Sequence, residues 1–91
     1  MINQVFLMGK IKDMANIENN EMIIQVRRNY KNTKGIFEND LFKCNLWIAL
    51  SKKIVLNCRE GDLVAIKGRL VDDGGSCNIL AEQVILLNKV S

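Results

Sequence analysis

Apolar and polar residues alternate along much of this chain, which is the pattern of β-strands that bury one face. In the stretch DLFKCNLW, residues 40–47, Phe42, Cys44 and Leu46 fall on one face and suit a core. The opposite face holds an apolar residue, a cation, an amide and the chain's only tryptophan: Leu41, Lys43, Asn45 and Trp47. The tryptophan therefore falls on the polar face, where its partner has to be something other than the core.

The same alternation predicts five strands, over residues 3–12, 22–30, 40–48, 63–70 and 77–87. The segments between them are polar or contain glycine: DMANIENN at 13–20, KNTKGIFE at 31–38 and DDGGS at 72–76. DDGGS predicts a tight hairpin turn. Gly9, inside the first strand, predicts a bend, a bulge or the close approach of another backbone.

Residues 51–59 have a different pattern, which predicts one short helix. Ser51 suits an N-cap, Ile54, Val55 and Cys58 share a helical face, and Gly61 suits the end. Three strands, a helix and two strands are the layout of the OB-fold, a five-stranded Greek-key barrel. We therefore predict an all-β fold in which residues 1–91 form a single domain. In an OB-fold, strands 2 and 3 form the usual ligand face with the loops between strands 1 and 2 and between strands 4 and 5.

The composition argues against several classes of protein. Hydrophobic residues make up 48% of the chain and charged residues 25%, which is typical of a soluble globular domain. No apolar run approaches the roughly 20 residues of a membrane span, and MINQVFLMGKIK lacks the features of a signal peptide. We therefore expect a cytoplasmic protein without membrane contacts. The three cysteines are widely spaced and histidine is absent, so we expect no disulfide framework, metal site or cofactor.

Charge is distributed unevenly along the chain. Residues 1–59 contain ten Lys or Arg and five Asp or Glu, whereas residues 60–91 contain three and five. The densest basic run is Arg27, Arg28, Lys31 and Lys34, and residues 22–37 contain no acid. A basic patch of this kind suits a polyanion, and an ordinary solvated loop is the alternative interpretation.

Four segments resemble the family of bacterial single-stranded DNA-binding proteins. MINQVFLMGKI is similar to that family's opening, DLFKCNLW to its third strand, REGDLVAIKGRL to its helix end and fourth strand, and LAEQVILL to its last strand. The four matches occur in the family's order over residues 2–87. The resemblance implies an OB-fold that binds single-stranded DNA without catalysis and largely without regard to sequence, in replication, recombination and repair. Stacking on aromatic side chains and contacts between cations and phosphates would provide the affinity.

The resemblance carries over to individual positions. Trp47 and Tyr30 match aromatic residues at the ends of strands 3 and 2, whereas Leu41 stands where the family has another stacking ring. Lys43 matches a basic or polar position between them. The predicted nucleic-acid-binding residues are Trp47, Tyr30, Lys43, Arg27, Arg28, Leu41, Asn45, Lys31, Lys34, Phe37, Lys67 and Arg69. The alternatives are packing under a loop or at a subunit interface for Trp47, packing at a strand end for Tyr30 and packing on the barrel for Phe37.

The resemblance also implies a homo-oligomer, a dimer or a tetramer, formed through the apolar first strand. The chain departs from the family in ending at NKVS, without an acidic tail, so we expect no tail-mediated protein partners. Its 71–76 turn is short and its aromatic content is 5%, which predicts weaker binding or a smaller footprint.

Three other functions compete with this interpretation. A primosome-assembly protein or another OB-fold interaction adaptor with secondary nucleic-acid affinity is the main alternative. RNA is an alternative to DNA, since stacking rings do not distinguish the sugars. An enzyme is poorly supported, because the sequence shows no nucleophile with a base and no metal site.

Overall fold

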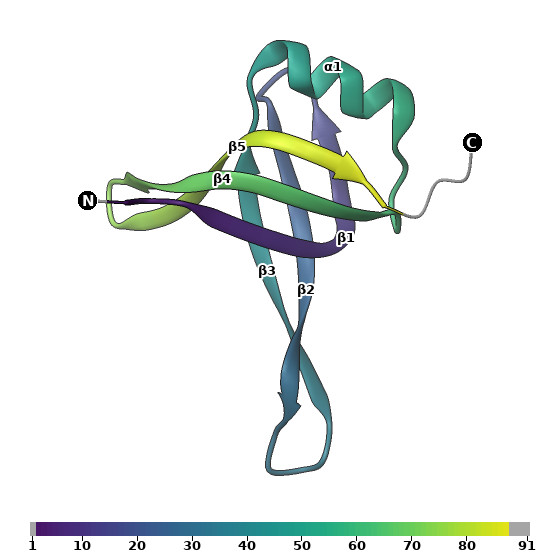
Figure 1. Cartoon of the computed structure of the whole chain (residues 1–91), viewed down its shortest axis with the longest axis vertical. Coiled ribbons are helices and arrows are strands. Elements are labelled where there is room, and N and C mark those ends of the chain that lie inside the picture. Colours follow the sequence, from purple (N-terminus) through teal and green to yellow (C-terminus); the bar gives the residue numbers. More distant parts are fainter. Residues whose placement is uncertain (1, 88–91) are drawn as a thin grey trace.

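The computed structural model describes residues 2–87, apart from the side chain of Asp73. The chain forms five strands and one helix, in the order β1 (Val5–Asn16), β2 (Glu21–Lys31), β3 (Phe37–Asn45), α1 (Ile48–Asn57), β4 (Leu63–Asp73) and β5 (Ser76–Leu86). The strands close into a barrel, with α1 at one end (Figure 1). The predicted all-β OB-fold, with its helix between strands 3 and 4, is confirmed.

Antiparallel ladders join most neighbours in the strand order β1-β2-β3-β5-β4, and β4 returns to β1. The β3–β5 junction is parallel and has two register pairs, Cys44 with Ile79 and Asn45 with Leu80. The inward-pointing residues of the strands include the fully buried Ile24, Val64 and Ile66. The predicted close backbone approach at Gly9 is confirmed, because a Cβ there would collide with the backbone oxygen of Gln25.

Helix α1 begins earlier than the sequence pattern predicted. Its N-cap is Trp47, and β3 ends at Asn45 instead of continuing to residue 48. Ser51, predicted as the N-cap, is wrong in that role, because it lies within the helix and is fully buried. The longer helix places Leu50 and Ile54, four residues apart, on its buried face. Burial of this apolar pair accounts for the earlier start.

Two of the predicted loops are shorter than expected. Strand β1 continues to Asn16, and its pairing with β2 shifts register on both sides of Asp13, so the polar residues there remain part of the strand. Strands β2 and β3 remain paired as far as Lys31 and Phe37, so the 31–38 loop shrinks to residues 32–36. The outer parts of these strands and this tip, residues 27–40, form a two-stranded arm that projects from the barrel (Figure 1).

The predicted hairpin turn at 72–76 is confirmed. Gly74 and Gly75 have φ angles of 60° and 99°, the left-handed pair required by a two-residue turn of type I′. Within residues 2–87, no helix is long and apolar enough to cross a membrane.

Candidate nucleic-acid interface

Outward-pointing side chains of three adjacent strands meet across the middle of the barrel. The β-ladders place Leu41 of β3 opposite Gln25 of β2, and Gln25 opposite Lys10 of β1. Leu41 and Lys10 are exposed, as is Lys43, two residues further along β3. Leu41 therefore presents an apolar surface between a cation on β1 and another on its own strand. We call this surface, with its continuation onto the arm, the β2–β3 face.

Lys43 is held by an ion pair on this face. Its ammonium nitrogen lies 3.1 Å from a carboxylate oxygen of Glu21 on β2. Glu21 in turn lies opposite Asn45, another predicted binding residue. The pair orients Lys43 and partly offsets its charge, so the unpaired cations further out contribute more of the positive potential.

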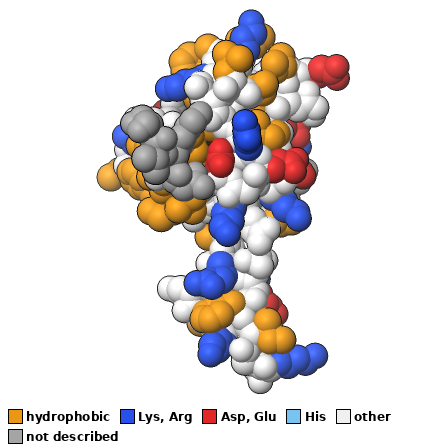
Figure 2. All heavy atoms as spheres, turned by 90° about the vertical axis from the view of Figure 1, so that its right-hand side faces the viewer, with side chains coloured by type: hydrophobic (Ala, Val, Ile, Leu, Met, Phe, Trp, Pro, Cys, Tyr) orange, Lys and Arg blue, Asp and Glu red, His pale blue; other side chains and the backbone are white. Residues whose placement is uncertain are grey.

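The arm carries a compact group of one ring and two cations. The guanidinium carbon of Arg27 lies 4.7 Å from the ring centroid of Phe37, and the ammonium of Lys31 lies 5.6 Å from it. Both distances lie within the range of cation–π attraction. Arg27, Lys31 and Phe37 thus bring together the two chemistries that single-stranded nucleic acids require. Lys and Arg side chains follow the arm, with hydrophobic side chains between them (Figure 2).

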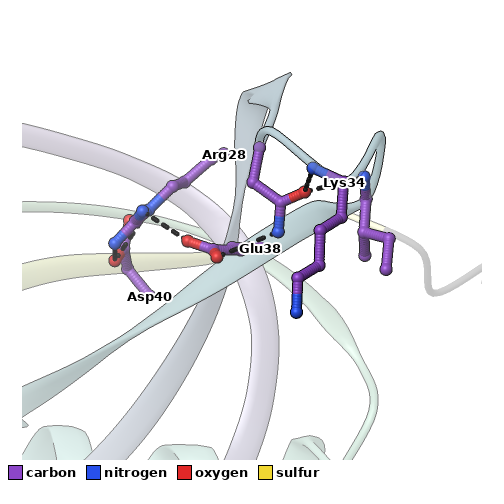
Figure 3. Close-up of polar contacts among 6 residues, drawn as sticks. Arg28, Lys34, Glu38 and Asp40 are labelled. Carbon is purple, nitrogen blue, oxygen red and sulfur yellow. Dashed lines mark hydrogen bonds and ion pairs between the residues drawn. The ribbon is translucent and has the colours of Figure 1, made fainter.

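Arg28 points to the other side of the arm, because consecutive residues of a strand alternate in direction. Its guanidinium donates to both carboxylate oxygens of Asp40 and to Glu38, at distances from 2.7 to 3.2 Å (Figure 3). The hydrogen bonds from Arg28 hold the pKa of Asp40 below its usual range, and Asp40 raises the pKa of Arg28. The structure therefore separates Arg28 from Arg27, its neighbour in the basic run.

Tyr30 and Lys34 lie on the outer part of the arm. The Tyr30 ring is 61% exposed, and Lys34 is an exposed residue of the tip. The carboxamide oxygen of Asn32 accepts hydrogen bonds from the backbone N–H groups of Lys34 and Ile36, which fixes the turn (Figure 3).

Trp47 lies at the opposite end of the β2–β3 face from the arm. Its side chain is 58% exposed and, with Leu80 and Glu82 of β5, lines a hollow of about 270 Å³. It also borders a groove between α1 and β5 that contains Lys53. Trp47 therefore continues the outward row of β3 beyond the end of the strand and extends the surface onto β5.

Known proteins resemble this chain in sequence. No protein-family model matches it. Single-stranded DNA-binding protein 1 of Streptococcus pyogenes serotype M18 is 31% identical over 77 residues, which cover 77% of this chain. The chain spans 59% of the length of that relative. The chain resembles bacterial single-stranded DNA-binding proteins, as its motifs predicted.

Solved structures of proteins with similar names share the fold. A mitochondrial single-stranded DNA-binding protein from S. cerevisiae has a TM-score of 0.76 at 10% identity, with 96% of each chain covered. A small single-stranded DNA-binding protein from Mycoplasma pneumoniae has a TM-score of 0.71 at 14% identity, with 100% of each chain covered. At such identities the likeness shows the fold alone, and it confirms the OB-fold barrel.

The two predicted cations of β4 lie in different surroundings. Arg69 is opposite Leu80, which lines the hollow beside Trp47, so it borders the same surface. Lys67 is opposite Phe6, and its ammonium lies 6.0 Å from that ring. It belongs to a separate outward patch, formed by β1, β4 and β5, in which Phe6 is 71% exposed.

Sequence reasoning did not find Lys10, Gln25, Glu38 or Asp40. The alternation of the first strand gives the outward direction of Lys10, but its neighbour Gln25 follows only from the β1–β2 register. Asp40 begins the quoted stretch DLFKCNLW, and its opposite charge to Arg28 was a detectable signal for cross-strand pairing. Within the described residues, no group of three or more acids or cysteines is arranged to hold a metal ion.

Proposed function

We propose that this chain binds single-stranded DNA without catalysis and with little dependence on base sequence. The observation that carries the proposal is the placement of exposed rings with cations on one continuous surface. Phe37 lies on the arm with Arg27 and Lys31, and Trp47 lies at the other end, beside β5. The S. pyogenes relative, named for single-stranded DNA binding, supports the ligand class.

Base stacking and attraction between cations and phosphates both contribute to the proposed binding. Trp47 and Phe37 offer flat apolar surfaces to bases, each stacked base contributing roughly 1–3 kcal/mol, whereas Tyr30, two residues after Arg28, lies on the other side of the arm. Arg27, Lys31 and Lys34 attract the phosphates between the bases, with an affinity that falls as salt displaces them. Leu41 offers apolar contact but no ring, so the middle of the surface binds less strongly than its ends. By binding this ligand, the protein would act in DNA replication, recombination and repair in the cytoplasm.

Fluorescence titration of Trp47 tests the function. Oligo-dT at low salt should quench the emission of Trp47, and the complex should weaken as salt rises. Trp47→Ala should bind roughly 1–3 kcal/mol more weakly when binding is followed by anisotropy of a labelled oligonucleotide. Trp47→Phe retains a ring and is the matched control. Absence of a complex at low salt, or full affinity in Trp47→Ala, would refute the proposal.

A parallel titration addresses the choice of nucleic acid. Oligo-dU and oligo-rU have the same base and differ in the sugar, so the tighter complex identifies the preferred class. We propose the deoxy form, and tighter binding of oligo-rU would reverse that choice.

We also propose a homo-oligomer, supported by the outward patch of β1, β4 and β5. Phe6, Met8 and Ile85 are exposed there around a hollow of about 370 Å³ that Ala65 and Lys67 also line. A large exposed apolar patch of this kind is typical of an interface. Light scattering should give a multiple of the 10.3 kDa chain, and Phe6→Glu should reduce it toward one chain. An unchanged mass in Phe6→Glu would locate the interface elsewhere.

A further inference from the structure

The two sides of the arm carry different kinds of side chain. One side holds the group of Arg27, Lys31 and Phe37. The other holds Arg28 and the two acids that it contacts, Glu38 and Asp40. Two members of the first group are adjacent in sequence to members of the second, Arg27 to Arg28 and Phe37 to Glu38. Fixing one side therefore fixes the backbone that presents the other.

A continuous set of hydrogen bonds joins the base of the arm to its tip. Arg28 makes a two-pronged contact with Asp40 and reaches Glu38 at 2.7 Å. The other oxygen of Glu38 accepts from the side-chain amide of Asn32 at 3.1 Å. The Asn32 oxygen accepts from the backbone of Lys34 and Ile36 at 2.9 and 3.0 Å. We call these four residues the arm network: Arg28, Asn32, Glu38 and Asp40 (Figure 3).

The arm needs such support because it extends beyond the core. An isolated two-stranded ribbon is marginally stable in water. The β2–β3 register also shifts between Arg27 and Lys31, which interrupts the regular ladder at the place where the ring and cations gather. Charge-assisted and bidentate hydrogen bonds between side chains hold the two strands of the arm together where the backbone ladder is interrupted.

We propose that the arm network positions the Phe37 ring for stacking on nucleic acid, and that Arg28 is a positioning residue that contacts no phosphate. This inference rests on the proposed function. The proposal also changes the expected effect of Glu38 and Asp40 on affinity. As isolated negative charges they would repel a polyanion, but as members of the arm network they favour its binding.

The direction in which one substitution changes the affinity for oligo-dT tests the proposal. Asp40→Asn keeps the size of the side chain and removes a negative charge, so simple electrostatics predicts tighter binding of oligo-dT. The network predicts binding weaker by roughly five- to tenfold, within the contribution of one stacked base. Glu60→Gln is the matched control, because it removes one exposed negative charge in the turn between α1 and β4, outside the arm. It should leave binding unchanged or slightly tighter.

Salt dependence separates positioning from phosphate contact. Arg28→Ala should weaken binding while leaving the slope of log K against log salt as in the unmodified protein. The Arg28→Ala/Asp40→Asn double variant should bind no more weakly than Arg28→Ala alone, because both substitutions break one network. A flatter slope in Arg28→Ala, additive effects in the double variant, or tighter binding by Asp40→Asn would each overturn the proposal.

Two readouts keep this test distinct from that of the function. If the unmodified protein forms no complex with oligo-dT, the proposed function fails, and the positioning role that rests on it fails with it. If it binds and Asp40→Asn binds more tightly, only the positioning role fails. Circular dichroism of each variant should show an intact barrel, since the arm lies outside the core. Asn32→Ala, which alters only the tip contacts, should weaken binding in the same direction, and unchanged binding would also count against the network.

Discussion

Arg27 and Phe37 face each other across the arm, with the guanidinium 4.7 Å from the ring centroid. The two residues come from different strands, β2 and β3, on either side of the register shift. The ring nevertheless remains 38% exposed. In the proposed complex a base would stack on the exposed part of Phe37 and Arg27 would lie beside the adjoining phosphate, so that one location would serve both parts of a nucleotide.

Replacing Phe37 by Leu should remove a stacking surface while keeping an apolar side chain. We expect the affinity for oligo-dT to fall by roughly 1–3 kcal/mol. Quenching of Trp47 emission measures it, since Trp47 lies at the other end of the face. Leu56→Ala, which truncates an exposed side chain of α1, should bind like the unmodified protein. Equal affinities of the Phe37 variant and the unmodified protein would exclude a stacking role.

Removing Arg27 and Lys31 together should change the salt dependence of binding. Each lost phosphate contact on a single strand lowers the slope of log K against log salt by about 0.7, so the double Ala variant should lose about 1.4. Titrations at several salt concentrations give this slope. Lys52→Ala/Arg59→Ala removes the same charge from the helix and its end, and should change the slope less. Equal changes would mean that binding senses only the net charge.

Ser51→Ala should stabilise the protein. Among the described residues, the fully buried hydroxyl of Ser51 has no hydrogen-bond partner, and alanine has the higher helix propensity. We expect the free energy of unfolding to rise by about 1 kcal/mol, measured by urea denaturation. Val55→Ala, which truncates an exposed helix residue, is a control for propensity alone. A loss of stability in Ser51→Ala would show that the hydroxyl has a partner.

The cysteines should differ sharply in reactivity. Cys77 is exposed, whereas burial raises the pKa of the Cys44 thiol to about 12. At neutral pH a disulfide reagent should therefore modify Cys77 first and Cys44 only after unfolding. Cys77→Ser should remove the fast phase, and a fast phase that persists would contradict this order.

The same burial makes stability depend on alkaline pH. The folded pKa of Cys44 exceeds its ordinary value of 9.0, so the contribution of the neutral thiol is complete below about pH 9 and is lost as the pH rises through about 12. Urea denaturation across this range should show a steeper decline than in Cys44→Ala. Parallel curves for the two proteins would mean that the pKa of Cys44 is the same in the folded and unfolded states.

Local patterns predicted the barrel better than they predicted the surface. Alternation over Phe42, Cys44 and Leu46 was enough to give the strand and its core face. The helix start was missed because the polar identity of Ser51 suggested a cap, whereas the apolar spacing of Leu50 and Ile54 decided the outcome. A buried helix face outweighs one capping hydrogen bond.

Partners across strands could not be predicted from single segments. Arg27 and Arg28 look alike in sequence, but strand direction sends one to Phe37 and the other to Asp40. The alternation of its strand predicted that Lys67 points outward, but the closed strand order places it beside Phe6. Both results depend on register and topology, which are non-local.

The parallel junction between β3 and β5 gives the barrel a preferred place to open. It has two register pairs, from residues 44–45 and 79–80, whereas the β1–β4 ladder that closes the other side has six. Trp47 follows this junction and lines a hollow together with Leu80. A strand of nucleic acid bound from Leu80 of β5 past Trp47 to β2 would cross the junction from outside and hold β3 and β5 together. Ligand and barrel closure are then thermodynamically linked, and saturation with oligonucleotide should slow amide exchange at Asn45 and Leu80 more than at β1.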